Sequence, residues 1–115
     1  MANGTIDLAT FRQLQETTGA EFVSELVGAF LEEAPGILED LRSAYAARDA
    51  ERFKRAAHSL KSNGNTFGAL DFGAKARELE LAGLSRVLEA KGDPISDLST
   101  EYARVAAALS ELRNA

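Results

Sequence analysis

The chain has 115 residues, a length that fits a single domain, residues 1–115, with one hydrophobic core. Hydrophobic residues make up 45% of it and charged residues 27%, as in globular proteins rather than disordered or fibrous ones. The 18 Asp and Glu residues outnumber the 13 Lys and Arg residues, and the net charge of -5 argues against broad electrostatic binding to nucleic acid or membranes. The lack of cysteine excludes disulfides and thiolate metal sites, and one histidine cannot by itself form a zinc or iron site.

The N-terminal residues lack the cationic start and apolar run of a signal peptide. No stretch reaches the roughly 20 apolar residues that a membrane-spanning helix needs. We therefore expect a soluble cytoplasmic protein that binds neither membranes nor nucleic acid.

The first part of the chain predicts three helices from apolar residues at helical spacing. A short helix covers residues 7–17 and stops before Gly19. The next covers residues 21–33, and Pro35 then predicts a break, with a further helix over residues 35–48. The apolar stripe of residues 21–33, expected to face the core, consists of Phe22, Val23, Leu26, Val27, Phe30 and Leu31.

Two aspartates are expected to cap helix N-termini. Asp7 would cap the first helix, and Asp49 would cap a long helix that runs to a C-terminal stop at Gly68. Another helix follows over residues 70–90, in which Gly83 costs about 1 kcal/mol relative to Ala unless close packing compensates.

A Lys-Gly-Asp-Pro turn at residues 91–94 precedes a final helix over residues 95–112. No segment shows the pattern of a strand. The expected fold class is therefore all-α: an antiparallel up-and-down four-helix bundle with an additional short N-terminal helix.

His58 is the single histidine, and its position on the predicted helix can be calculated. At about 100° per residue it lies roughly 140° from Phe53 and 160° from Leu60, both candidates for the core. We therefore expect the imidazole to face solvent. The residues three, four and seven positions away share its face: Lys54, Arg55, Lys61, Ser62 and Asn65.

This basic, hydrogen-bonding face suits phosphoryl chemistry. Three cations disfavour the imidazolium form, which leaves a neutral ring with a nucleophilic nitrogen near pH 7. The cations would attract an incoming phosphoryl group, and Lys61 would pair with it once it is attached. The alternative is a solvated helix face without a function.

Residues 57–69, AHSLKSNGNTFGA, resemble the signature of the histidine-containing phosphotransfer (HPt) domain family of two-component phosphorelays, approximately H-x-L-K-G-x-x-x-x-h-G-A with h apolar. Residues 76–80, Ala-Arg-Glu-Leu-Glu, also look like the next helix of that family. Ser62 departs from the pattern, because the family usually has Gly there; its hydroxymethyl group would either crowd a partner or hydrogen-bond the phosphoryl oxygens. The positions that match in register are His58, Leu60, Lys61, Phe67, Gly68 and Ala69.

The resemblance implies a phosphorelay intermediate. His58 would accept a phosphoryl group from the phospho-aspartate of a receiver domain and pass it to another receiver domain. The implied partners are response-regulator receiver domains and a hybrid sensor histidine kinase. The receiver would bring Mg²⁺, so no cofactor of the chain's own is expected. Because no Gly-rich nucleotide-binding loop is present, we expect a phosphocarrier without ATP binding or autokinase activity, not an enzyme.

The expected site residues fall into three groups. Those predicted to stabilise the phosphoryl group are Lys61, Ser62, Arg55 and Asn65. Those predicted to dock the partner are Leu8, Phe11 and Lys54, although Leu8 and Phe11 would equally fit as caps on the core. Gly64 and Gly68 are predicted to be structural, the first by allowing close helix packing and the second by ending the helix that carries His58.

Two other functions stay open. One is an adaptor bundle without phosphoryl chemistry that binds receiver or other signalling proteins. The other is an enzyme that uses His58 as a general base. No Asp or Glu lies on the same helix face to orient the imidazole, so this function would need a carboxylate from another helix.

Overall fold

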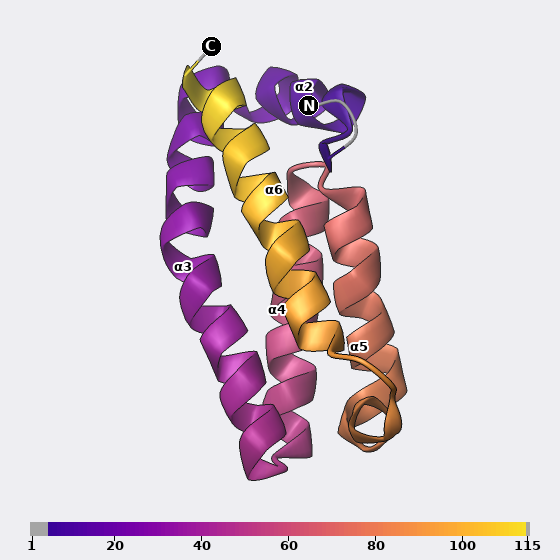
Figure 1. Cartoon of the computed structure of the whole chain (residues 1–115). Coiled ribbons are helices and arrows are strands. Elements are labelled where there is room, and N and C mark those ends of the chain that lie inside the picture. Colours follow the sequence, from indigo (N-terminus) through magenta and orange to yellow (C-terminus); the bar gives the residue numbers. More distant parts are fainter. Residues whose placement is uncertain (1–4, 115) are drawn as a thin grey trace.

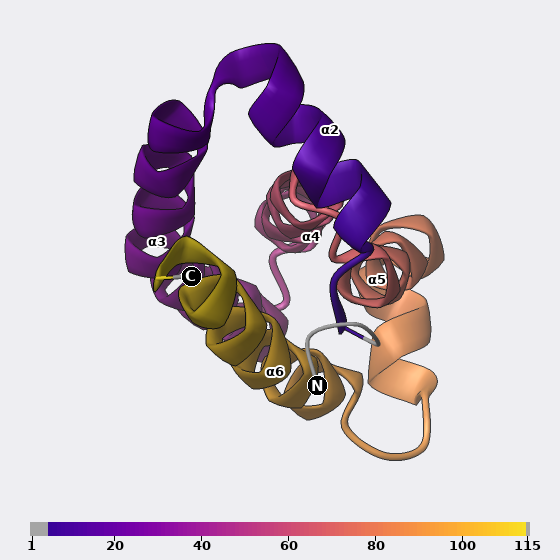
Figure 2. The same cartoon turned by 90° about the horizontal axis from the view of Figure 1, so that it is seen from above.

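The computed structural model describes residues 5–114, and this part of the chain is helical with no strand (Figure 1). Four long helices lie side by side with alternating chain direction, and a short one crosses the end where the chain terminates (Figures 1 and 2). The all-helical prediction is confirmed, and none of these helices is long and apolar enough to cross a membrane. The helices are α2 (Leu8–Thr18), α3 (Ala20–Ala47), α4 (Ala50–Thr66), α5 (Leu70–Glu89) and α6 (Pro94–Asn114).

Both predicted N-caps are confirmed. The Asp7 carboxylate accepts a hydrogen bond from the backbone N–H of Thr10 at the start of α2, at 3.3 Å. The Asp49 carboxylate accepts one from the backbone N–H of Arg52 at the start of α4, at 3.2 Å. Each carboxylate thus satisfies a helix N–H group that has no partner within its own helix.

The core runs along the axis of the bundle, between the inward faces of the helices. Aromatic side chains meet at its centre, where the Phe30 ring lies 5.4 Å from the Phe67 ring and 6.5 Å from the Phe72 ring, measured between centroids. The largest fully buried side chains come from the residues before α2 and from the four long helices: Ile6, Val23, Val27, Leu41, Phe53, Leu60, Phe72, Ile95, Leu98, Val105 and Leu109.

The predicted break at Pro35 is wrong, because α3 continues through it from Ala20 to Ala47. Proline removes the N–H group that would bond to the carbonyl of Leu31, four residues earlier. The Tyr102 hydroxyl from α6 lies 3.5 Å from that carbonyl oxygen, and burial raises the pKa of Tyr102, which keeps the donor protonated. Buried residues also occur on both sides of Pro35, so packing holds the two halves of α3 in line.

Among residues 5–113, three large apolar side chains are exposed: Phe22, Leu70 and Leu81. The expectation that Phe22 faces the core is therefore wrong. Val23 is fully buried, and the neighbouring Phe22 points about 100° away from it.

Helix α5 is interrupted at Gly83, whose backbone dihedrals of φ 77° and ψ 165° are not helical. A positive φ of this kind is readily adopted by glycine alone. The two helical segments on either side of Gly83 differ in direction (Figure 1).

Candidate functional site

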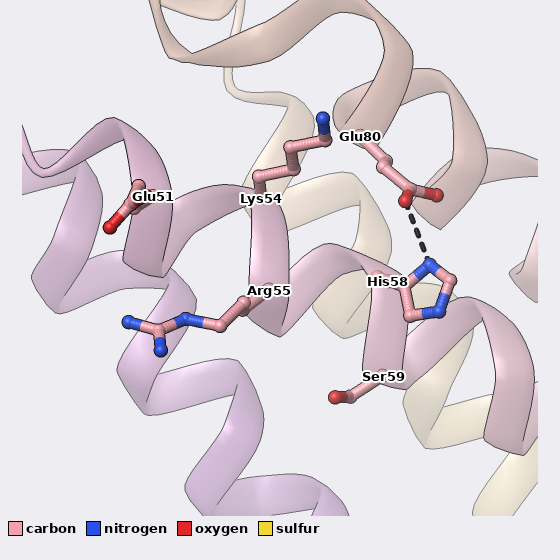
Figure 3. A pocket seen from close by; sticks show the side chains of 6 residues that line it. All are labelled: Glu51, Lys54, Arg55, His58, Ser59 and Glu80. Atoms are coloured by element: carbon pink, nitrogen blue, oxygen red, sulfur yellow. Dashed lines mark hydrogen bonds and ion pairs between the residues drawn. The ribbon is translucent and has the colours of Figure 1, made fainter.

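Helix α4 presents His58 to solvent because its other side packs into the core. Phe53, Ala57 and Leu60 are fully buried, whereas the His58 side chain is 57% exposed. The expectation that the imidazole faces solvent is confirmed. The ring is nevertheless held in place, since its Nδ1 atom lies 2.8 Å from Oε2 of Glu80 on the neighbouring helix α5 (Figure 3).

Glu80 connects two residues of α4. While Oε2 contacts the imidazole, Oε1 lies 2.8 Å from the Nζ atom of Lys61. The Lys61 ammonium is the main cause that lowers the pKa of Glu80; partial burial acts in the opposite direction, and the contact with His58 lowers the pKa further. Glu80 is therefore an anion at neutral pH.

This contact fixes the tautomer of a neutral His58. An ionised carboxylate can only accept hydrogen bonds, so Nδ1 carries the proton and donates it to Glu80. The lone pair is then on Nε2, which lies on the far side of the ring from Glu80 (Figure 3). Nε2 is thus the ring nitrogen with a free lone pair, and the Nδ1 proton held by Glu80 keeps it so.

A hollow beside the imidazole is lined by residues of α4 and by Glu80 of α5. Lys54 and Arg55, two of the three predicted cations, line it but project from α4 in different directions (Figure 3). The third cation, Lys61, is paired with Glu80. The imidazole is therefore not surrounded by cations alone, as the sequence suggested, because a carboxylate touches it. The lining residues are Glu51, Lys54, Arg55, His58, Ser59 and Glu80.

Seen along α4, the predicted phosphoryl contacts lie on two sides of His58. At about 100° per residue, Lys61 lies about 60° toward α5, whereas Ser62 and Arg55 lie about 40° and 60° to the other side. Because the Nδ1 edge of the ring faces Glu80, its Nε2 edge is turned away from α5. Ser62 and Arg55, both exposed, are on that side.

Asn65 lies against α5 instead. A Cβ atom at Gly73 would be only 2.0 Å from Asn65 Oδ1, so the amide occupies the space that any side chain at position 73 would need. Seven residues of helix separate Asn65 from His58, a rise of about 10 Å. The predicted contact of Asn65 with the phosphoryl group stays a prediction, which this placement does not favour.

The two glycines singled out from the sequence lie at close contacts. Gly64 is buried, and an added Cβ would lie 2.6 Å from Cδ2 of Phe72. Gly68 follows the end of α4 with a φ of +86°, and its carbonyl accepts a hydrogen bond from the backbone N–H of Asp7, at 2.8 Å. Both positions therefore have a structural reason to be glycine.

The predicted docking residues on α2 need a correction. Phe11 is 3% exposed and belongs to the core, so its ring cannot form a docking surface. Leu8 is half-buried at the same end of the bundle. Lys54, in contrast, is exposed at the hollow beside His58.

Glu80 is the residue that sequence reasoning missed. It belongs to the segment of residues 76–80, noted for its resemblance, but its contact with His58 depends on how α4 and α5 pack. Glu80 supplies the carboxylate that a general base would need, yet the imidazole lies on an open surface, where water is poorly excluded. The exposed position favours a reaction with another protein.

Comparisons with known proteins identify the family of the chain. The family model of the Hpt domain matches residues 25–115. The crystal structure of histidine-containing phosphotransfer protein B (HptB) from Pseudomonas aeruginosa PAO1 is similar, with a TM-score of 0.84 and 26% sequence identity over 96% of this chain and 95% of that chain. A comparison with curated proteins gave no match. The chain belongs to the Hpt domain family and acts in phosphotransfer in two-component signalling.

Proposed function

We propose that His58 is the phosphorylated residue of a phosphorelay. It accepts a phosphoryl group from the phospho-aspartate of one receiver domain, for example that of a hybrid sensor histidine kinase, and passes it to the receiver domain of a response regulator. The observation that carries the proposal is the contact of 2.8 Å between Nδ1 and Glu80, which orients an exposed imidazole and leaves Nε2 free.

The chemical step needs no further group from this chain. The Nε2 lone pair attacks phosphorus in line with the aspartyl oxygen; the N–P bond forms as the P–O bond breaks, and the aspartate leaves as a carboxylate. The Nδ1 proton stays on the ring, where the Glu80 anion offsets the positive charge that develops on the imidazole. The reverse reaction with a second receiver returns the phosphoryl group to an aspartate. The receiver would supply Mg²⁺ to neutralise the phosphoryl oxygens.

Three residues around His58 are proposed to stabilise the phosphoryl group. Ser62 and Arg55 lie on the side of α4 away from Glu80. The Ser62 hydroxyl is proposed to bond to the phosphoryl oxygens directly, and the Arg55 guanidinium, which extends away from the imidazole (Figure 3), is proposed to turn toward them once the phosphoryl group is attached. Lys61 has three N–H donors, of which the contact with Glu80 needs one. The same lysine can therefore hold Glu80 and approach the phosphoryl group.

The test is transfer of labelled phosphate from a panel of phosphorylated receiver domains to the wild type and to His58→Gln. We expect label on the wild type alone, released again when an unphosphorylated second receiver is added. Circular dichroism would verify that the variant is folded. If His58→Gln is labelled as well, His58 is not the acceptor; if the folded wild type binds receivers but never takes up label, the protein is an adaptor.

A further inference from the structure

Glu80 is held in place from two sides. Its side chain is only 12% exposed, and Oε2 lies 2.8 Å from Nδ1 of His58. Oε1 is buried and lies 2.8 Å from Nζ of Lys61, so moving the carboxylate away would leave a buried oxygen without its cation. A phosphoryl group on Nε2 would be attached to the far side of the ring (Figure 3). We therefore expect the contact between Nδ1 and Glu80 to persist in the phosphorylated protein.

We infer that Glu80 keeps the proton on Nδ1 after His58 has been phosphorylated, so that onward transfer releases a neutral imidazole. The inference rests on the proposed function and adds a role for Glu80 in the second half of the relay, in which the phosphoryl group leaves. Lys61 is a positioning residue in this step, because its contact with Oε1 holds Glu80 against the ring.

The charge of the departing ring decides how readily the phosphoryl group leaves it. When an oxygen of a receiver aspartate or of water attacks phosphorus, the O–P bond forms, the N–P bond breaks and its electron pair returns to Nε2. In hydrolysis the attacking water gives one proton to a phosphate oxygen. With a proton on Nδ1 the ring departs as neutral imidazole, whereas without it the ring would depart as an imidazolate anion, a far stronger base and a poorer leaving group.

Other charges near the ring act on the Nδ1 proton as well, and distance decides between them. Lys54 and Arg55 are exposed, so water screens them, whereas the Glu80 carboxylate is in direct contact with Nδ1. Asp40 of α3 lines a separate hollow, and Asp7 contacts Gly68, about 15 Å further along α4. The charged side chains at the imidazole and its hollow are Glu51, Lys54, Arg55 and Lys61 of α4 and Glu80 of α5.

The test compares the half-life of phosphohistidine in the wild type, in Glu80→Gln and in Glu78→Gln. Glu78 is exposed two residues earlier on α5, about 200° around the helix, so its variant loses the same charge away from the ring. Each protein is charged with phosphoramidate to completion, freed of the reagent and followed by ³¹P NMR, while circular dichroism verifies the fold.

A glutamine amide bonds equally well to a protonated and an unprotonated Nδ1, because it carries both an oxygen and an NH₂ group. It therefore does not hold the proton as a carboxylate does. At about pH 8 we expect the half-life to be about tenfold longer in Glu80→Gln and unchanged in Glu78→Gln. At about pH 5 solvent supplies the proton in every variant, so the half-lives should converge.

Three results would overturn the inference. An equal or shorter half-life of Glu80→Gln at about pH 8 would show that the carboxylate does not activate the phosphoryl group. An equal effect of Glu78→Gln would mean that the net charge of the helix matters rather than the contact. A difference that persists at about pH 5 would show that Glu80 acts through packing and not through the Nδ1 proton. Equal charging of folded His58→Gln by phosphoramidate would instead overturn the proposed function, because His58 is the single histidine.

Discussion

The substitution Gly64→Ala tests the close contact between α4 and α5. The added Cβ would lie 2.6 Å from Cδ2 of Phe72. The Phe72 ring is fully buried and packs against the rings of Phe30 and Tyr102, so it has little room to move. Overpacking of this kind costs about 1–3 kcal/mol, and the higher helix propensity of alanine returns about 1 kcal/mol. We expect a net loss of about 0–2 kcal/mol in the free energy of unfolding.

Gly36→Ala is a matched control. Gly36 is inside α3, and a Cβ added there would meet nothing within 4 Å. Alanine therefore brings its helix propensity without a clash and should raise the free energy of unfolding by about 1 kcal/mol. Because the propensity gain is common to both variants, the difference between them, about 1–3 kcal/mol, isolates the clash with Phe72.

Urea denaturation followed by circular dichroism measures both variants, with an unchanged m-value as evidence that the unfolded states are comparable. For a domain of this size each kcal/mol corresponds to about 4 °C in Tm, so the two Tm values should differ by about 4–12 °C. If Gly64→Ala is as stable as Gly36→Ala, α4 and α5 are not as close as described and the packing argument fails.

Four further predictions concern the site and the helix ends. Glu80→Gln should slow phosphorylation by phosphoramidate about tenfold, since a neutral amide cannot offset charge on the imidazole; an unchanged rate would contradict the role given to the carboxylate. Because Lys61 lowers the pKa of Glu80 in the folded state, the stability contributed by the ionised carboxylate is present above the ordinary glutamate pKa and is lost as the pH falls through the lowered value. Urea unfolding at a series of pH values should therefore show the difference between wild type and Glu80→Gln shrink only in acid. Ser62→Gly and Ser62→Ala should both shorten the lifetime of phosphohistidine about tenfold, measured by ³¹P NMR; an effect of Gly alone would point to backbone flexibility instead of the hydroxyl. Arg48→Gly should raise Tm by several degrees, because Arg48 ends α3 with a φ of +58° that glycine adopts without strain; a lower Tm would show that the bond from its side chain to the Tyr45 carbonyl matters more.

The sequence by itself determined the local features of this fold. Asp7 and Asp49 mark where helices begin because their side chains bond to backbone groups three residues away. The exposure of His58 followed from the apolar residues around it, since the turn of a helix depends only on its own residues. The motif of residues 57–69 pointed to the family for the same reason, because its residues lie close together in the chain.

The tertiary structure alone decided which residues of different helices meet. Pro35 breaks a helix locally, but packing on both sides and the Tyr102 hydroxyl near the unpaired carbonyl keep α3 continuous. Glu80 reaches His58 because α4 and α5 pack at one particular rotation and stagger, and helical periodicity within either segment does not specify these. The orientation of the imidazole, and with it the nitrogen that is left free, is therefore a property of the assembled bundle.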